Sequence, residues 1–357
     1  MPGAVASPLS DPPLIVVAPT MTAFVGSGGA GPADTAVRIG GPADFETTFG
    51  PFADAGDLGM AVSLFLGNGG DGVWVVRAED GSRGLRALDA LPRIDLMALP
   101  GQTGLAAQAG ALAYAEARGA LLILDLPATV TGAASAQAWL NDAAALRHPN
   151  AMATFPHIQG AGAGQPTTNC GAVAGAMVRL ERTRGLWKAA SGIEAVLQGV
   201  TWLATQLTSA ESAALALQGL NPLRRLPGGQ VVIWGARTLA SGTAQEEDWR
   251  YVPVRRMALF LERSLGESLT WTAVEANAEP LWAAVRQSVE SFLAELWRAG
   301  AFQGATPRTG YYVRCDATTM TEADIEAGRL IVEVGTAPLK PAEFVILQIS
   351  ARATPPG

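Results

Sequence analysis

The chain alternates short runs that are apolar at every position with longer segments whose apolar residues recur every three to four positions. The first pattern predicts strands that are buried on both faces, and the second predicts amphipathic helices that cover them. The predicted strands are Thr22–Val25, Val37–Ile39, Val73–Val76, Asp95–Leu99, Leu121–Leu126, Ala151–Phe155, Val231–Trp234, Tyr311–Asp316 and Arg329–Val334. The predicted helices are Asp44–Phe49, Leu58–Leu66, Ala106–Arg118, Ala134–Leu146, Gly171–Arg184, Tyr251–Leu265 and Thr321–Ala327.

Two of the predicted helices are strongly amphipathic. Tyr251–Leu265 has a continuous apolar stripe, so we expect Arg256, which is off that stripe, to face outward. A further helix runs to Trp297, and Asn277 is its predicted N-cap because an amide side chain can accept hydrogen bonds from the first turn.

Each end of the sequence holds an apolar strand that is bordered by prolines. The first strand is Leu14–Ala18 and the second is Glu343–Ser350. Such a strand has few local neighbours that can bury it. It therefore packs within its own chain or pairs with another copy of the chain by strand addition, and both alternatives stay open on the pattern alone.

The pattern of predicted strands and helices changes near residue 89, and this change predicts the domain organisation. Segment 89–230 reads as a self-contained strand–helix module, which predicts an α/β fold with an α+β core and one inserted α/β domain. The predicted parts are an N-terminal arm (1–20), a discontinuous core (21–88 and 231–340), the inserted domain (89–230) and a C-terminal arm (341–357).

The composition contains little charge for a chain of 357 residues. Charged residues make up 16% of the sequence, against about 25% in an average soluble domain. Neighbouring molecules that cover the surface would explain this, and so would a composition rich in Ala and Gly. The net charge of −7 does not favour a nucleic-acid partner, and no run of about 20 apolar residues predicts insertion into a membrane.

The sequence offers weak candidates for catalytic, cofactor or metal chemistry. Gly26–Gly31 matches G-x-G-x-x-G after a strand, but the predicted strand Val37–Ile39 leaves no room for the helix that a dinucleotide site requires. A tight turn is favoured, and a Rossmann-like nucleotide-binding enzyme stays the alternative function. His148, His157 and Cys170 match no metal-ligand spacing, and we expect the histidines to be solvated. We predict no catalytic residue, cofactor or metal ligand.

Several short motifs follow one another in an order that is typical of one family. They include Thr22-Ala23-Phe24-Val25-Gly26, Arg184-Gly185-Leu186-Trp187-Lys188-Ala189, Asn221-Pro222-Leu223-Arg224-Arg225, Trp234-Gly235-Ala236-Arg237-Thr238, Tyr251-Val252-Pro253-Val254-Arg255-Arg256, Glu279-Pro280-Leu281-Trp282 and Pro341-Ala342-Glu343-Phe344. The chain resembles the contractile tail sheath family of contractile-tailed phages, R-type pyocins and extracellular contractile injection systems. The resemblance covers roughly residues 14–350.

The resemblance implies a structural protein without a cofactor. Sheath subunits polymerise with one another as stacked six-fold rings around an inner tube, and contraction drives the tube through a target membrane. The implied partners are this chain itself, the inner tube protein, baseplate and terminator or cap proteins, and paralogous sheath subunits where a particle has them. The implied location is the bacterial cytoplasm during assembly, and afterwards the phage tail or tail-like particle.

The resemblance also assigns roles to particular residues. The end strands would add to sheets of neighbouring subunits, through Leu14, Ile15, Val16, Val17, Phe344, Val345, Ile346, Leu347 and Ile349. A short charged helix would face the inner tube, and Thr321–Ala327 is its candidate, with Glu322, Asp324 and Glu326 exposed. These acids are equally consistent with favouring the positive end of their own helix.

Overall fold

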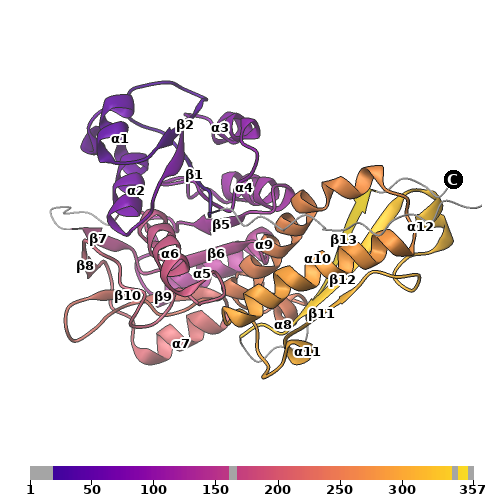
Figure 1. The fold of residues 1–357 in the computed structure, drawn as a ribbon. Coiled ribbons are helices and arrows are strands. Elements are labelled where there is room, and N and C mark those ends of the chain that lie inside the picture. The colour runs from indigo at the N-terminus through magenta and orange to yellow at the C-terminus, as the bar shows by residue number, and fades with distance from the viewer. Residues whose placement is uncertain (1–18, 161–166, 340–344, 353–357) are drawn as a thin grey trace, which may run out of the picture. The chain divides into compact units, whose positions relative to one another are not determined.

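The computed structural model describes residues 19–160, 167–339 and 345–352 (Figure 1). The chain divides into two compact units between Arg256 and Met257, within helix α9 (Val252–Ser268). The predicted arm residues Leu14–Val17 and Phe344 lie outside the described residues. No helix in the described part of the chain is long and apolar enough to cross a membrane.

The first unit is built on an eight-stranded sheet with the order β10-β9-β6-β5-β4-β1-β3-β2. The strands from β9 to β3 pair in parallel, and β10 and β2 pair antiparallel at the two ends of this order. The predicted mixed α/β fold is thereby confirmed. The strands are β1 (Thr22–Gly26), β2 (Ala36–Ile39), β3 (Val73–Arg77), β4 (Leu96–Ala98), β5 (Leu121–Leu124), β6 (Ala151–Phe155), β9 (Leu220–Arg225) and β10 (Val231–Ile233).

Helices cover both faces of this sheet, which explains why central strands such as β4 and β5 are apolar at every position. Phe24 of β1 packs in one core with α2 and α6, while Ala23 and Val25 pack in a second core with α3, α4 and α5. The helices of the unit are α1 (Pro42–Phe49), α2 (Gly56–Gly67), α3 (Gly81–Ala87), α4 (Leu105–Ala117), α5 (Ala133–Asp142), α6 (Cys170–Arg184), α7 (Ser209–Leu217) and α8 (Glu246–Trp249), with short 3-10 turns at Phe52–Ala55, Leu88–Ala90 and Ala144–Leu146.

Helices α2 and α6 pack closely because α6 carries glycines at their contact. A Cβ atom on Gly171 would collide with the carbonyl of Ala61, and one on Gly175 would collide with the carbonyl of Phe65. The ring of Phe65 lies edge-on to that of Phe24 on the sheet, with 5.5 Å between the ring centroids. The glycines therefore let α6 lie against α2 over the same core.

The sheet continues across the domain boundary that the sequence predicts near residue 88. Thr22–Phe24 of β1 pairs with Leu96–Ala98 of β4, so segments 21–88 and 89–230 contribute to one sheet. An inserted domain is not confirmed, and the two compact units divide after Arg256 instead of at residue 230. Local patterns identify buried parallel strands, but they carry no information on which strands become neighbours.

Three strands of the first unit are missing from the prediction. β7 (Ile158–Gly160) and β8 (Val200–Leu203) form a separate two-stranded ladder, and β9 pairs with β6 and β10. The sequence of β9 contains Asn221, Pro222 and two arginines, which do not give an apolar run. β8 carries an exposed Trp202 and likewise shows no buried-strand pattern.

The position of Arg256 in α9 differs from the prediction. Its side chain is 7% exposed, and its Nη2 donates to Glu181 Oε2 at 2.7 Å. The hydroxyl of Thr20 donates to the other carboxylate oxygen of Glu181 at 2.5 Å. The expectation that Arg256 faces outward is therefore wrong, because Glu181 at the C-terminal end of α6 covers that side of α9.

The second unit contains helices around a three-stranded antiparallel sheet with the order β11-β12-β13. Leu330, Val332 and Val334 alternate along β12 and are buried on one face. Helices α9 and α10 meet through Phe260 and Phe292, whose ring centroids are 6.1 Å apart. The elements of the unit are the end of α9, α10 (Glu279–Arg298), α11 (Pro307–Gly310), α12 (Glu322–Glu326), β11 (Tyr311–Arg314), β12 (Arg329–Thr336) and β13 (Val345–Arg352), with a 3-10 turn at Thr270–Val274.

Candidate assembly surface

The C-terminal strand β13 pairs antiparallel with β12 of the same chain. The register begins with Arg329 opposite Arg352 and ends with Thr336 opposite Val345, which makes eight residue pairs. Pairing with a second copy of the chain stays a prediction. Four residues predicted to contact other subunits lie in β13, namely Val345, Ile346, Leu347 and Ile349.

The three-stranded sheet has two outer strands, β11 and β13. Within the described residues, each of them pairs only with the central strand β12. An outer strand presents a row of backbone N–H and C=O groups that an additional strand can pair with. Pro338, in the segment that follows β12, forms an antiparallel bridge with Phe302. The covalent connection to β13 passes through residues 340–344, outside the described residues.

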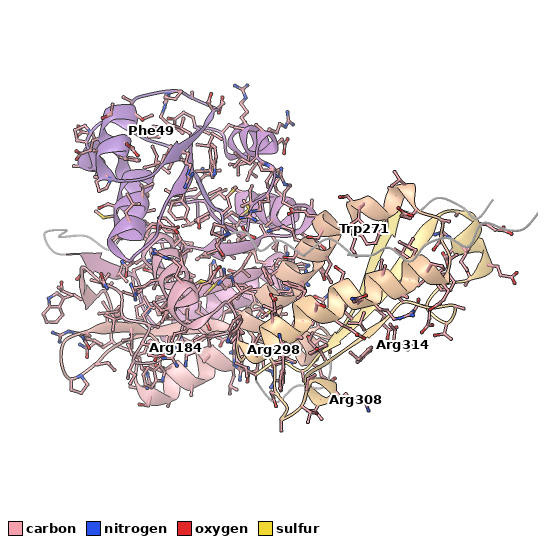
Figure 2. All side chains as sticks on the ribbon, in the orientation of Figure 1. Phe49, Arg184, Trp271, Arg298, Arg308 and Arg314 are labelled. Atoms are coloured by element: carbon pink, nitrogen blue, oxygen red, sulfur yellow. The ribbon has the colours of Figure 1, made fainter. Side chains whose placement is uncertain are left out.

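Cross-strand polar contacts accompany the apolar face of the sheet. Arg314 on β11, labelled in Figure 2, forms an ion pair with Glu333 on β12 at 3.4 Å. The hydroxyl of Tyr312 donates to the same carboxylate at 3.0 Å. Such pairs each contribute roughly 0.2–1 kcal/mol and favour the pairing of β11 with β12.

Asn277 connects α10 to this sheet instead of capping the helix. Its amide oxygen accepts a hydrogen bond from Trp282 Nε1 at 2.8 Å, and its amide nitrogen donates to the carbonyl of Arg329 at 3.1 Å. Ala278 occupies the N-cap position, without a side-chain hydrogen bond. The N-cap prediction is therefore wrong, because the contact with β12 uses the amide group that capping would need.

The short helix α12 has a capping box at its N-terminus. The hydroxyl of Thr321 accepts from the Asp324 N–H at 3.1 Å, and the Thr321 N–H donates to Asp324 Oδ2 at 2.9 Å. Arg329 Nη2 lies 2.7 Å from Asp324 Oδ1. The hydrogen bonds from Thr321, together with Arg329, lower the pKa of Asp324 to about 2.

The three acidic side chains of α12 therefore differ in their surroundings. Asp324 is half-buried and is engaged by its own helix and by Arg329, which agrees with the interpretation that it stabilises the helix N-terminus. Glu322 and Glu326 are exposed. A contact between these two glutamates and an inner tube stays a prediction.

The glycine-rich turn after β1 differs from a dinucleotide-binding loop. In the described segment between β1 and β2, the chain forms no helix whose amides could point at a pyrophosphate. Gly28, at φ 109°, and Gly31, at φ 82°, need the left-handed region that favours glycine. A Cβ atom on Gly28 would lie 2.6 Å from the carbonyl oxygen of Ala55, and one on Gly31 would collide with that of Thr48. The glycines thus allow close packing of the turn against its own chain.

A small cavity of about 170 Å³ lies beyond the carboxyl ends of strands β4 and β5, where nucleotides bind in many folds of this class. Asp125 occupies the N-terminus of α6 there, because its Oδ1 accepts from the N–H groups of Asn169 at 2.9 Å and Cys170 at 3.0 Å. Asp57 also lines the cavity, and burial together with the charge of Asp125 raises its pKa. Carboxylates in this position disfavour a phosphate ligand.

The candidate metal ligands do not form a cluster in the described part of the chain. His157 is 7% exposed, and its Nε2 lies 3.1 Å from the carbonyl oxygen of Pro127, so the expectation that it is solvated is wrong. His148 lies near Glu116, with 3.4 Å between Nε2 and Oε1. Burial raises the pKa of the Cys170 thiol, which is fully enclosed. These side chains are explained by packing and local hydrogen bonds.

The sequence is similar to known tail sheath proteins. Residues 244–352 match the family described as the phage tail sheath C-terminal domain, a segment that includes the described second unit. The tail sheath protein of Vibrio phage KVP40 is 23% identical over 185 residues, which are 52% of this chain and 26% of that protein. The chain therefore spans about a quarter of the length of this curated relative.

The fold is similar to solved sheath structures over almost the whole chain. The sheath complex of the extracellular contractile injection system PVC, in its contracted state, has a TM-score of 0.79 at 24% identity and covers 98% of this chain and 97% of that chain. The contracted helical sheath of the anti-feeding prophage has a TM-score of 0.74 at 26% identity, with coverage of 97% and 98%. The sheath tail protein of Listeria innocua has a TM-score of 0.70 at 10% identity, with coverage of 95% and 96%.

Proposed function

We propose that this chain, whose resemblance to the contractile tail sheath family is confirmed, is a structural subunit of a contractile sheath. The observation that carries the proposal is its likeness, over nearly all its length, to the contracted sheath of the anti-feeding prophage. In this proposal the subunits assemble as stacked six-fold rings around an inner tube. Contraction then drives the tube through a target membrane, and no nucleotide is consumed because subunit contacts store the energy.

The sheet β11-β12-β13 supports a strand-exchange connection between subunits. β13 is the last strand among the described residues, and it meets its own chain along one edge, through the eight residue pairs with β12. A β13 strand from a neighbouring copy would form the same pairs with the same register. Exchange therefore replaces one set of backbone hydrogen bonds with an equivalent set, each worth about 1 kcal/mol net.

The N-terminal segment Leu14–Val17 completes this scheme. It is apolar and has proline neighbours, and the sheet has two outer strands to which a further strand can add. Exchange at both ends of each subunit would link every copy to at least two others. Such links persist while the remaining parts of the subunits rotate, which contraction requires.

The other partners follow from the same proposal. The exposed glutamates Glu322 and Glu326 of α12 would face the inner tube, where a polar contact releases easily when the sheath widens. Baseplate and terminator or cap proteins would bind the two ends of the sheath, and paralogous subunits would join it where a particle encodes them. We place assembly in the bacterial cytoplasm, followed by a place in a phage tail or tail-like particle.

Cysteine pairs test the strand exchange directly. Ile331 faces Ser350 across β12 and β13, so these positions are neighbours in the paired sheet. We would mix a chain carrying Ile331→Cys with a chain carrying Ser350→Cys, allow polymers to form, and oxidise them. The proposal predicts disulfide-linked dimers that contain one chain of each kind. The matched control mixes Ile331→Cys with Arg83→Cys, on an exposed part of α3, and should give monomers.

Deletion of the end segments separates assembly from folding. Removing residues 342–357 or residues 1–19 should leave a soluble monomer that melts cooperatively by circular dichroism but forms no polymers. If the mixed cysteine chains stay monomeric in polymers that clearly form, then β13 remains in its own chain. If the intact chain forms no polymer at all, the sheath proposal itself is wrong.

A further inference from the structure

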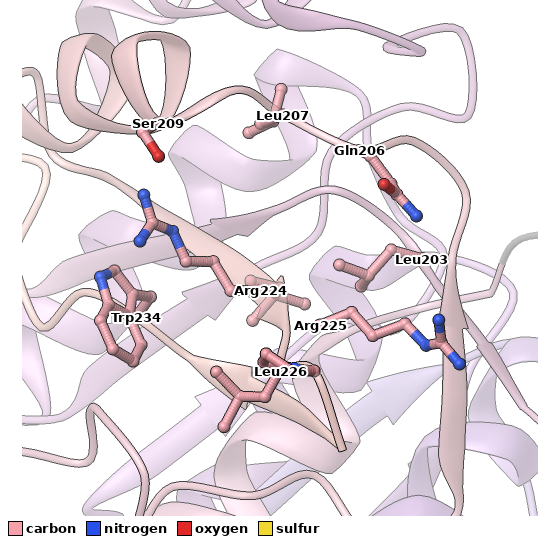
Figure 3. Close-up of a pocket in the computed structure, with 10 residues that line it drawn as sticks. Leu203, Gln206, Leu207, Ser209, Arg224, Arg225, Leu226 and Trp234 are labelled. Carbon is pink, nitrogen blue, oxygen red and sulfur yellow. The ribbon is translucent and has the colours of Figure 1, made fainter. Parts of the chain in front are cut away.

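A cleft of about 500 Å³ lies in the first unit between β8, β9, β10 and the start of α7 (Figure 3). Adjacent residues Arg224 and Arg225 of β9 line it from below, and Figure 3 shows their guanidinium groups directed to opposite sides of it. Ser209 and Gln206 lie on the other wall. The apolar lining consists of Leu203, Leu207, Leu223, Leu226 and Pro227.

Each of the two arginines stacks against a tryptophan. The guanidinium carbon of Arg224 lies 5.1 Å from the ring centre of Trp234, and that of Arg225 lies 4.2 Å from the ring centre of Trp202. Stacking fixes the orientation of each guanidinium and leaves its N–H groups free to bind an acceptor. Among the described residues, neither arginine forms an ion pair with a carboxylate.

Both tryptophans are unusually exposed for their size. Trp202 is 53% exposed and Trp234 is 39% exposed. Tryptophan and arginine together are the residue types that contribute most to the binding energy of protein interfaces. Their pairing beside a leucine-lined cleft is therefore the composition expected at the centre of an interface, with charge at its edges.

The charge of the chain identifies the class of partner. Residues 257–357 hold twelve Asp and Glu but only eight Lys and Arg, so this part of the molecule is acidic. The exposed carboxylates there include those of Glu290 and Glu295 on α10, which project from a regular helix. Each copy therefore carries exposed carboxylates in this part of the chain that can pair with the arginines of this cleft.

We propose that the cleft lined by Arg224, Arg225 and Trp234, with Trp202 stacked on Arg225 beside it, binds a carboxylate-bearing segment of residues 257–357 of a second copy of this chain. This contact rests on the proposed polymerisation and adds to it a specific interface outside the exchanged strands. Because the two guanidinium groups are directed to opposite sides, each pairs with a carboxylate of its own, and the apolar part of the segment covers the leucines and the exposed tryptophan rings.

A zero-length cross-link identifies what binds in the cleft. The chain contains only two lysines, Lys188 and Lys340, so few background links with a carbodiimide are expected. Lys188 lies 3.3 Å from Glu194 and should give a link within one chain, which isotope labelling distinguishes from a link between copies. Arg225→Lys keeps the positive charge and supplies an amine that forms an amide with an adjacent activated carboxylate. We would polymerise a mixture of ¹⁵N-labelled and unlabelled Arg225→Lys chains, treat it with carbodiimide, and identify the linked peptides by mass spectrometry.

The proposal predicts mixed-isotope peptide pairs that join residue 225 of one copy to an acidic residue within 257–357 of another. Arg86→Lys, at an exposed position on α3, is the matched control and should give no such pair. A link from residue 225 to a carboxylate of the first unit would overturn the assignment of the partner, and the absence of any inter-copy link would overturn the contact.

Charge reversal provides an independent measurement. Arg224→Glu with Arg225→Glu should raise the critical concentration for polymerisation at least tenfold, which corresponds to about 1.4 kcal/mol per subunit. Arg224→Lys with Arg225→Lys keeps the charges but loses the planar groups that stack on the tryptophans, so it should raise the critical concentration by less than charge reversal does. A circular dichroism melt of the monomers checks that both variants fold. Unchanged polymerisation of the reversed variant would overturn the contact while leaving the sheath proposal intact.

Discussion

The buried ion pair between Arg256 and Glu181 gives the sharpest stability prediction for the first unit. Arg256 is 7% exposed and Glu181 is 19% exposed, and their closest atoms are 2.7 Å apart. Removing one partner of a buried pair typically costs about 3–5 kcal/mol, because the other charge stays buried without compensation. The partial exposure of Glu181 reduces this cost, since water can solvate a carboxylate that has lost its arginine.

The two single substitutions should therefore differ in size. Arg256→Met leaves Glu181 with the hydroxyl of Thr20 and some water, and we expect a loss of about 2 kcal/mol in the free energy of unfolding. Glu181→Leu leaves a buried guanidinium without its carboxylate partner, and we expect a loss of about 3–4 kcal/mol. The double variant Glu181→Leu with Arg256→Met buries no unpaired charge and should recover at least about 1 kcal/mol relative to the sum of the single losses.

Urea titration of the monomeric chain measures the losses in the free energy of unfolding. Hydrogen exchange of the α6 amides then assigns these losses to the unit that contains the ion pair. The matched control is Arg118→Met with Asp89→Leu, where the acidic partner is 62% exposed and we expect a coupling of less than about 0.5 kcal/mol. Additive effects at Glu181 and Arg256, or a smaller loss for Glu181→Leu than for Arg256→Met, would contradict this reasoning.

Three further predictions concern α12 and the segment of residues 161–165. Glu322→Lys with Glu326→Lys should impair assembly of extended sheaths around a tube yet permit tube-free polymers in electron micrographs; normal extended particles would remove α12 from the tube contact. The low pKa of Asp324, about 2 instead of 3.8, means that its ionised form stabilises α12 above pH 3.8 and that this stabilisation is lost as the pH falls through about 2. Asp324→Asn should abolish that pH dependence in the hydrogen exchange of α12, and an unchanged profile would refute it. A tag inserted between residues 161 and 165, outside the described residues, should still permit polymers, whereas loss of assembly by a folded monomer would make that segment an inter-subunit contact.

The sequence predicts most of the secondary structure because local patterns determine it. The apolar runs at β1, β3, β4, β5 and β6 and the amphipathic stripes of α9 and α10 all correspond to elements of the structure. Local patterns do not determine which strands pair with one another in the sheet. β1 pairs with β4, although the sequence pattern assigned the two strands to different domains. Adjacent parallel strands in one sheet need no shared sequence pattern, so the sequence does not reveal this pairing.

The polar residues illustrate the same limit. Arg256 and Asn277 carry the chemistry of a surface position and of a helix cap, but contacts with α6 and β12 give them other roles. The cleft combines Arg224 of β9 with Trp234, which directly follows β10 and lies about ten positions away in the sequence, and no local period connects the two residues. A signal was nevertheless present in the adjacent arginines of a segment that also contains a proline and lacks nearby carboxylates.

Electron cryo-microscopy of the polymer formed by the intact, overproduced chain tests the central claim most directly. A helical reconstruction should show six subunits in each ring, with the β13 strand of one copy lying on β12 of a neighbour. The wall should enclose a channel wide enough for an inner tube. Discrete particles, or a polymer in which every β13 remains on β12 of its own chain, would contradict the account of a sheath linked by strand exchange.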